Sequence, residues 1–557
     1  MRRLLTSALL CATAVALWAT AVRVQAQTPA APAAAATPAR RTPPLVVLLV
    51  IDQFRADYIA QYSAAWTGGL RRLIDGGADF RQAAYPYFAT ETCPGHATIG
   101  TGAFPRTHGI VANGWYDRDA KQSVVCTTDQ TKSVGFGGEA GYEQHGPRYL
   151  RVPTLADELR AQATGAKVVS LSLKARAAIA MAGRGGDVVA WLEDAGTWAT
   201  STAYAAKPPA SADAFVRAHG VDKDYERVWN LLRPATSYAF TDAGEAEQAP
   251  DGMTTVFPHS LSRPAGPDRI FYDNWRRTPF SDDYLGQMAI ALSKGLGKGP
   301  GTDMLAVSFS ATDYVGHRFG PRSWEVQDTL ARLDLTIGKL LDALDASVGK
   351  GRYVVALSAD HGVAPIPEQQ VALKLDAGRF AAADVQAAID KALTATIGHA
   401  DVFMAGSTES GNNASDVYFT AETLAKLKAT PAARQAVVSA VEKVAGVGKV
   451  MWASELSSLA VVDADARAFA QSFNADRNGD LIVLPKPYWL SSSGGTGHGT
   501  MHQYDQRVPV ILMGAGIKPG RYDVAVTPAD IAPTLAFLAG VTLSKADGRV
   551  LSEALIR

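Results

Sequence analysis

Several aspartate and histidine residues occur in positions typical of metal ligands. Asp313 and His317 are four residues apart, a spacing that places both side chains on one face of a helical turn. Asp360 and His361 directly follow an apolar run and precede Gly362, whose freedom lets the backbone turn sharply. Taken singly, the first motif is more often an exposed ion pair, and the second indicates a capped turn. The argument for a metal site therefore depends on the complete set.

Asp52 and His498 complete this set. Asp52 ends another apolar run, where it could instead cap a helix. His498 lies in the glycine-rich segment 494–499, which has nothing apolar to bury, although His502 nearby competes for the role. Mixed oxygen and nitrogen ligands suit Zn²⁺ better than Ca²⁺ or Mg²⁺. Six ligands are too many for one tetrahedral zinc ion and suit two, which can stabilise the attacking and leaving oxygens of an in-line displacement.

A two-metal site of this kind needs a nucleophile, and Thr92 is the candidate. It lies in the polar segment 90–96, ahead of the stretch 97–101. Coordination to a metal would activate the hydroxyl, and a helix N-terminus behind it would favour the alkoxide and a phosphoryl product. Read alone, Thr92 is more simply a helix N-cap.

The elements that must position these residues are short apolar runs. Helical patterns lie between them, at 154–161 and 323–346. Near-continuous apolar strands that alternate with helices predict an α/β fold, with a central, mostly parallel sheet sandwiched by helices. Ligands bind beyond the carboxyl ends of such strands, so the fold would gather the polar residues in one cleft. The runs are 45–51, 167–171, 304–309, 353–357 and 508–513.

Two segments do not fit this alternation. Residues 200–282 are rich in Pro, Gly and aromatic residues, and residues 368–455 contain helical patterns. We expect both to be insertions that cover the active-site side of a catalytic domain spanning 45–557. Asp476–Asp480 resembles the start of a calcium loop, but the Gly and Glu of such a loop are missing. A tight turn is therefore favoured there, with a structural Ca²⁺ as the alternative.

The N-terminus has the pattern of an export signal. Arg2 and Arg3 precede an apolar run that ends in a small-residue cleavage site, which predicts a signal peptide at 1–26, with an uncleaved membrane anchor as the less favoured alternative. The Ala- and Pro-rich segment 27–44 predicts disorder, and no later run is long enough to span a bilayer. We therefore expect a periplasmic or secreted protein, in which Cys93 and Cys126 could form a disulfide or stay small buried side chains.

Charge gives no argument for a nucleic-acid partner. Lys and Arg number 54, as do Asp and Glu, so the formal net charge is zero. Nothing in the sequence indicates an oligomeric state.

Several motifs, matching in order and spacing, resemble the alkaline phosphatase superfamily. Within it, the chain is similar to the Thr-nucleophile alkaline phosphatases of the sphingomonad and flavobacterial type. The matching motifs are Val50–Arg55, Thr92–His96, Thr107–Ile110, Ser172–Arg176, Asp313–His317, Ala359–Gly362 and Asp530–Thr534.

The resemblance implies a role for each candidate residue. Tyr504 and Asp505 follow His498 as in the family pattern, which favours His498 over His502. Asn113 corresponds to a side chain that contacts a phosphoryl oxygen, and Lys174 and Arg176 to a cationic pair for phosphate monoesters. One Zn²⁺ would be held by Asp313, His317 and His498, and the other by Asp52, Asp360, His361 and Thr92.

The implied activity is zinc-dependent hydrolysis of small phosphate monoesters through a phosphothreonine, with secondary diesterase activity. The main alternative is a phosphodiesterase or nucleotide pyrophosphatase, relatives of which usually lack equivalents of Lys174 and Arg176. An inactive phosphate-binding exported protein would require a broken ligand set or a lost nucleophile, and neither is seen. A sulfatase is excluded, because Thr92 cannot form the catalytic aldehyde and His96 replaces the required Arg.

Overall fold

A computed structural model describes residues 42–556, apart from 139–140, 142, 195, 265, 399–401 and 405–415. The expected signal peptide at 1–26 and residues 27–41 of the expected disordered segment lie outside these described residues. Pro43 already belongs to the fold, because it is buried and its carbonyl oxygen accepts a hydrogen bond from Thr302 Oγ1 at 2.8 Å. Within the described part of the chain, no helix is both long enough and apolar enough to cross a bilayer.

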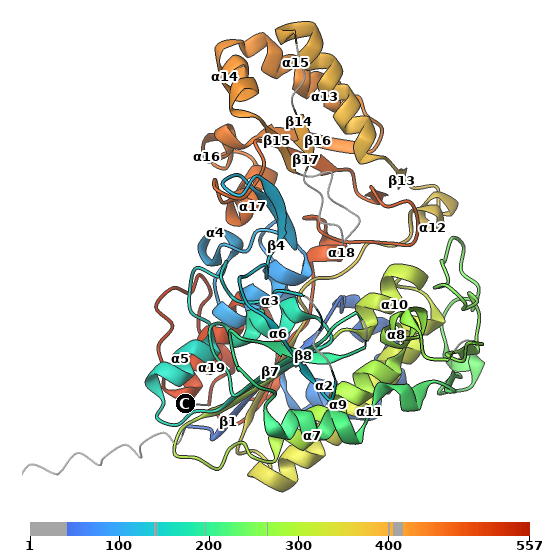
Figure 1. The fold of residues 1–557 in the computed structure, drawn as a ribbon, viewed down its shortest axis with the longest axis vertical. Coiled ribbons are helices and arrows are strands. Elements are labelled where there is room, and N and C mark those ends of the chain that lie inside the picture. Colours follow the sequence, from blue (N-terminus) through green and yellow to red (C-terminus); the bar gives the residue numbers. More distant parts are fainter. Residues whose placement is uncertain are drawn as a thin grey trace, which may run out of the picture. The chain divides into compact units, whose positions relative to one another are not determined.

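The described residues form a central sheet of ten strands (Figure 1). Five adjacent strands in its middle, from β12 to β7, are parallel, and the pairings β12–β19, β19–β2, β7–β8 and β8–β5 are antiparallel. The predicted mostly parallel sheet is therefore confirmed. The strands, in spatial order, are β20 (Gly520–Val526), β2 (Ala78–Ala83), β19 (Val510–Gly514), β12 (Val354–Ser358), β1 (Leu45–Ile51), β11 (Asp303–Phe309), β6 (Val168–Ser172), β7 (Val188–Leu192), β8 (Trp198–Ser201) and β5 (Ser133–Phe136).

Helices cover both faces of the middle of this sheet, which is why its central strands β1, β11 and β12 are buried throughout. In β1, Val47 and Leu49 face one core, whereas Val46 and Leu48 face the other, and all four are fully buried. Burial of each such side chain contributes about 1.5–3 kcal/mol. The first core includes helices α2 (Gly69–Gly76), α9 (Pro279–Ser293) and α11 (Trp324–Leu344), and the second includes α3 (Thr92–Thr101), α5 (Leu155–Gln162) and α19 (Ile531–Ala539).

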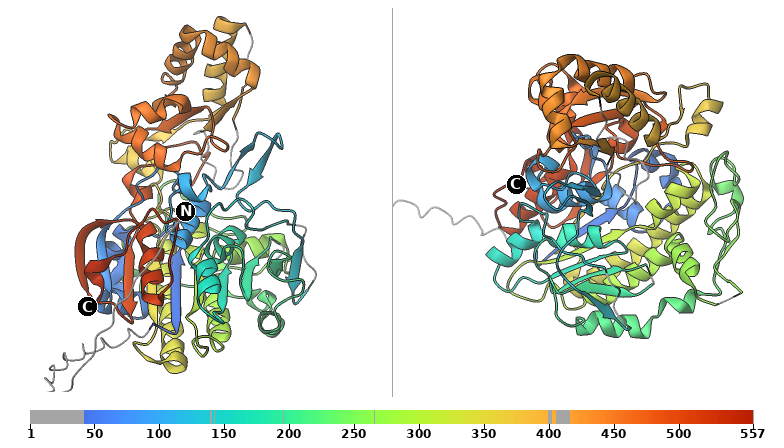
Figure 2. Two further views of the ribbon diagram at one scale, coloured as in Figure 1. Left: turned by 90° about the vertical axis from the view of Figure 1, so that its left-hand side faces the viewer. Right: turned by 45° about the horizontal axis from the view of Figure 1, so that its top comes forward.

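The segment expected at 368–455 builds a second, smaller unit with a core of its own (Figure 2). Its four-stranded sheet has the order β14-β15-β17-β16, so the inner strand β17 comes from beyond residue 455. Arg379 Nη2 donates to Gly495 O at 2.8 Å, which ties this unit to the loop that carries His498. The elements are α13 (Ala382–Ile397), β14 (Val402–Met404), β15 (Asp416–Phe419), α14 (Ala421–Ala429), α15 (Pro431–Val441), β16 (Val447–Trp452) and β17 (Leu481–Pro485).

The segment expected at 200–282 packs against the first core instead of forming a separate one. Trp229, Phe271 and Trp275 are buried in that core, the last two on α8 (Arg269–Arg276). The segment also reaches the ligand region, because Gln248 N donates to the carbonyl oxygen of Arg318, the residue after His317.

The loop that resembles a calcium site is a turn before β17. Both carboxylate oxygens of Asp480 accept hydrogen bonds, from Arg118 Nη2 and from Phe419 N. Asp476 pairs with Arg151 at 2.9 Å, so the carboxylates of Asp476 and Asp480 both already have partners within the protein. The structure thus favours the turn over the calcium alternative.

Candidate active site

Four neighbouring strands deliver the chemical groups of the site. Asp52 follows β1, Lys174 follows β6 and Asp360 follows β12, while Asp313 lies in the first turn of α10 (Ala311–Phe319), which follows β11. Because these four strands are parallel, their carboxyl ends meet at one edge of the sheet. His317, His361 and His498 lie at the same place.

Two groups of these side chains could each hold a cation. Ligand atoms of Asp313, His317 and His498 all lie within 4.8 Å of one another, as do those of Asp52, Asp313 and His361. Asp313 belongs to both groups, whereas the sequence assigned it to one. Asp360 lies beside the second group, with its Oδ2 3.3 Å from His361 Nε2. The six expected ligands therefore form two adjacent candidate cation sites that share a carboxylate.

The orientation of the three imidazoles suits cation binding. In each ring Nδ1 lies 2.9 Å from a backbone carbonyl oxygen, so a proton on Nδ1 is satisfied and Nε2 is left with its lone pair. Each Nε2 lies within 3.7 Å of a site carboxylate. Burial, with the neighbouring His361 and His317, lowers the pKa of His498 well below its ordinary value, which favours the neutral ring that a metal needs.

Two buried carboxylate oxygens also suit the site to binding a cation. Asp52 Oδ1 and Asp360 Oδ2 are fully buried and accept no hydrogen bond of good geometry, although His96 Nδ1 lies 3.2 Å from Asp360 Oδ2. A buried acceptor of this kind is costly unless a positive partner compensates it. The residues present therefore fit two bound cations.

Thr92 is the first residue of α3 and lies against the second group. Its Oγ1 is 3.5 Å from His361 Nε2, and the residue is 1% exposed. The N-cap position is occupied by Glu91, not Thr92. The reading of Thr92 as an N-cap is therefore wrong, and its hydroxyl faces the ligand cluster at a helix N-terminus.

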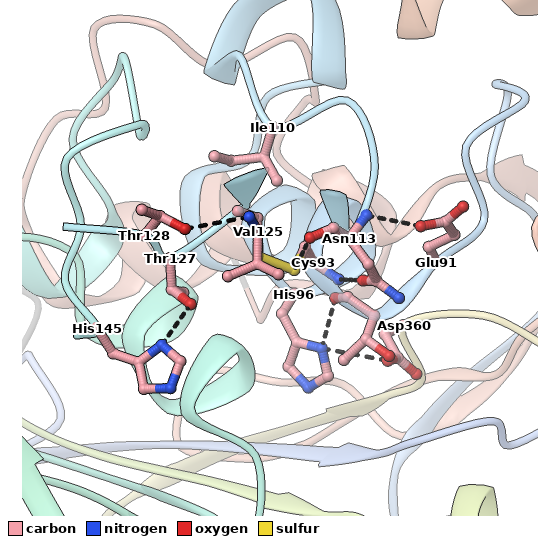
Figure 3. The surroundings of a disulfide bond; sticks show 12 residues. Glu91, Cys93, His96, Ile110, Asn113, Val125, Thr127, Thr128, His145 and Asp360 are labelled. Carbon is pink, nitrogen blue, oxygen red and sulfur yellow. Dashed lines mark hydrogen bonds and ion pairs between the residues drawn. A yellow bond between two sulfur atoms is a disulfide. The ribbon is translucent and has the colours of Figure 1, made fainter. Parts of the chain in front are cut away.

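Asn113 is held next to Thr92 by its own backbone and by a disulfide. Its Oδ1 accepts a hydrogen bond from Cys93 N at 2.8 Å, and its N donates to Glu91 Oε2 at 2.6 Å (Figure 3). Cys93 forms a disulfide with Cys126, whose N donates to Asn113 O at 2.8 Å. Because Oδ1 is already engaged, Nδ2 is the amide group that an anionic oxygen near Thr92 would meet.

Lys174 lies between the two candidate cation sites. Its Nζ is 2.7 Å from Asp52 Oδ2 and 2.5 Å from Asp313 Oδ2. Burial opposes its charge, yet Asp313 and Asp52 raise the pKa of Lys174 above its ordinary value, so it is protonated. Arg176, in the first turn of α6 (Ala175–Ala182), is close enough to act electrostatically on Lys174. Lys174 therefore contacts carboxylates of the candidate cation sites, and Arg176 lies near Lys174.

Comparison with known proteins agrees with this geometry. The pattern of the family described as "Type I phosphodiesterase / nucleotide pyrophosphatase" matches residues 46–505. The chain is 33% identical to "Alkaline phosphatase PafA" of Elizabethkingia meningoseptica, over 92% of this chain and 95% of that protein. The chain belongs to the alkaline phosphatase superfamily. It is also 32% identical to "Alkaline phosphatase PhoK" of Sphingomonas sp, over 93% of this chain and 91% of that one.

Solved structures of superfamily members share the fold. The crystal structure of wild type alkaline phosphatase PafA matches with a TM-score of 0.83 at 32% identity, covering 93% of this chain and 99% of that chain. Murine ectonucleotide pyrophosphatase / phosphodiesterase 5 matches with a TM-score of 0.54 at 13% identity, a likeness that concerns the fold alone.

Two buried residues that the sequence did not single out hold the ligands of this superfamily site in place. Gln53 Nε2 donates to Asp313 Oδ1 at 2.7 Å, and Gln53 N donates to Asp360 Oδ1 at 3.1 Å. His96 Nδ1 lies 3.2 Å from Asp360 Oδ2 and 2.9 Å from Thr92 O. Both residues occur inside motifs that match the family, and this was the sign of their importance that the sequence offered. Neither has the combination of residue type and spacing by which the metal ligands were recognised.

Replacing Gln53 should disturb the site without removing a ligand. Gln53→Met keeps the length of the side chain and removes the donor to Asp313, so we expect kcat/KM for a phosphate monoester to fall about 10–100-fold. Metal content should fall in parallel when the variant is dialysed against a weak chelator. Gln61→Met, on an exposed residue that bonds only Asp57 among the described contacts, is the matched control. Equal kcat/KM in the two variants would show that Gln53 does not position Asp313.

Proposed function

We propose that the chain is an exported, zinc-dependent alkaline phosphatase that hydrolyses phosphate monoesters through a phosphothreonine at Thr92. The observation that carries this proposal is the position of the cations Lys174 and Arg176. Lys174 contacts Asp52 and Asp313, Arg176 lies near Lys174, and the Thr92 hydroxyl lies against His361 of the same ligand cluster. A phosphate monoester has one more negative charge than a diester, and this pair adds the charge that would favour it.

The chain's own residues can perform the reaction in two displacements. Zn²⁺ bound at each group would lower the pKa of a coordinated hydroxyl and neutralise charge on the phosphate. Thr92 Oγ1 forms a bond to phosphorus as the bond to the leaving alcohol breaks, giving a phosphothreonine. Water then attacks the same phosphorus, and the Thr92–phosphorus bond breaks to release phosphate. Asn113 Nδ2, Lys174 and Arg176 stabilise negative charge on the phosphoryl oxygens.

A phosphodiesterase is the second candidate, because the family pattern that matches most of the chain carries that description. We propose diesterase activity as secondary. Four relatives that match over nine-tenths of the chain are alkaline phosphatases by name, which supports the monoesterase. The complete set of ligands and the retained Thr92 argue against an inactive phosphate-binding protein.

Turnover of two matched substrates tests the proposed function. We expect kcat/KM for p-nitrophenyl phosphate to exceed that for bis-p-nitrophenyl phosphate by at least about 10²-fold, since each lost charged contact is worth roughly 1.5–3 kcal/mol. A preference for the diester would identify the chain as a phosphodiesterase.

Metal analysis tests the two candidate cation sites separately. Elemental analysis of the exported protein should find two zinc ions per chain. His498→Ala removes a ligand of one group only, so it should retain about one ion. His502→Ala is the matched control, because His502 Nε2 lies 3.0 Å from the carbonyl oxygen of Pro485, outside both groups, and should leave two. Two ions in His498→Ala would remove His498 from the ligand set.

The disulfide between Cys93 and Cys126 supports export. Such bonds persist in oxidising compartments and are rare in the cytosol. A periplasmic or secreted enzyme would meet small phosphate esters, the substrates that the site fits.

A further inference from the structure

A groove at the edge of the main sheet is outside the site described above. It has a volume of about 630 Å³ and lies between α1 (Asp57–Tyr62) and α2 on one side and the strands β2 and β20 on the other. None of the candidate metal ligands lines it, nor do Thr92, Asn113, Lys174 and Arg176. A groove of this size is within the usual range for small-molecule sites.

Five arginines line this groove and give it a positive charge. Arg55 and Arg71 are paired with Asp57 and Asp75. The other three form no ion pair within 4.0 Å in the described part of the chain. These three are Arg81, Arg507 and Arg521.

Asp79 lines the groove with these arginines, and Asp75 and Asp523 lie near enough to act electrostatically on Arg521 and on Asp79, respectively. Asp79 is paired with Arg521 in the register of β2 with β20, and Arg81 is two residues further along β2, where this pairing becomes irregular. Burial raises the pKa of Asp79, against the opposing effect of Arg81 and Arg521. Asp79 therefore compensates only part of this charge. Arg507 Nη2 donates to Arg81 O at 2.9 Å, which places Arg507 beside Arg81, and guanidinium groups match the oxygens of a phosphate.

The groove also has an aromatic and apolar part of its lining. The rings of Tyr488 and Tyr504 have centroids 5.6 Å apart and an interplanar angle of 30°, and Ile59, Ile74 and Val508 line the groove as well. A flat ring system could stack on the tyrosines while a phosphate reaches the arginines.

We propose that this groove is a second, non-catalytic binding site for a small phosphorylated molecule with a flat ring, of the chemical class of a nucleoside monophosphate. The arginines would bind the phosphate, and the tyrosines would bind the ring. Arg55 also donates to Val363 O at 3.1 Å, next to the loop that carries Asp360 and His361. The arginines to test are therefore Arg81 and Arg521, which are exposed and touch no candidate ligand.

Titration calorimetry with AMP tests the proposal, in the zinc-loaded Thr92→Ala protein so that AMP is not consumed. Arg81→Ala/Arg521→Ala in this background should bind one equivalent of AMP fewer than the background itself. Arg160→Ala/Arg217→Ala removes the same charge from exposed residues outside the groove and should lose none. Equal stoichiometry in the two double variants would overturn the proposal.

Two further measurements separate loss of this site from loss of the fold. With Thr92 restored, Arg81→Ala/Arg521→Ala should hydrolyse p-nitrophenyl phosphate at a rate within about twofold of wild type, since surface substitutions change little. If that double variant unfolds, the conservative Arg521→Gln repeats the test and should weaken AMP binding in the groove at least tenfold. Adenosine, which lacks the phosphate, should likewise bind at least tenfold more weakly than AMP. Unchanged AMP affinity in Arg521→Gln, or equal affinity for adenosine, would refute a phosphate site.

Discussion

Thr92→Ala is expected to lower kcat for p-nitrophenyl phosphate by about 10⁴-fold or more, because it removes the atom that forms the covalent intermediate. The substitution is small and lies at a helix start where Glu91 holds the N-cap position, so folding should be little affected. Metal content should stay near that of wild type, because three protein ligands remain in each group. Rate measurements and elemental analysis on the same preparation check both statements.

Thr92→Ser is the matched variant, since it keeps the hydroxyl and removes only the methyl group. It should retain kcat within about 10–100-fold of wild type, whereas the alanine variant does not. In addition, acid quenching of wild type during turnover, followed by mass spectrometry, should find phosphate on the peptide that contains Thr92. A Thr92→Ala protein that still turns over at the rate of Thr92→Ser would mean that water attacks the substrate directly.

The sequence alone could predict the location of those site residues that directly follow the end of a strand. Asp52 and Asp360 each follow an apolar run, and parallel strands must bring their carboxyl ends to one edge, so their meeting follows from local patterns alone. His498 lies in the loop after β18 (Trp489–Leu490), a two-residue strand outside the main sheet. Its assignment rested on the composition of the loop and on a family motif.

The features that could not be predicted depend on contacts between distant segments. Gln53 reaches Asp313 across 260 positions, and nothing in a buried glutamine beside an aspartate indicates which carboxylate it will bond. Likewise, β17 joins the second sheet from beyond the expected boundary at residue 455 because strand pairing is non-local. Asp313 was assigned to one metal group, but its position between two groups follows from the packing of α10 against its neighbours.

Removing the cationic pair should separate the two hydrolase activities. Each charged hydrogen bond to a phosphoryl oxygen is worth roughly 1.5–3 kcal/mol, so Lys174→Ala/Arg176→Ala should lower kcat/KM for p-nitrophenyl phosphate by about 10²–10⁴-fold. The diester bis-p-nitrophenyl phosphate has one fewer negative oxygen to stabilise. Its kcat/KM should therefore fall by much less, about tenfold or below.

The single variants decide how this result is interpreted, because the two cations have different surroundings. Lys174 Nζ contacts Asp52 and Asp313, so Lys174→Ala also changes the electrostatics of both candidate metal groups and could lower every activity. Arg176→Ala leaves the contacts of Lys174 with Asp52 and Asp313 in place, which makes it the cleaner probe. A loss in Arg176→Ala that is confined to the monoester would establish recognition of the extra charge. An equal loss for both esters, with zinc content unchanged, would mean that the pair serves a phosphodiesterase site and that the monoester assignment is wrong.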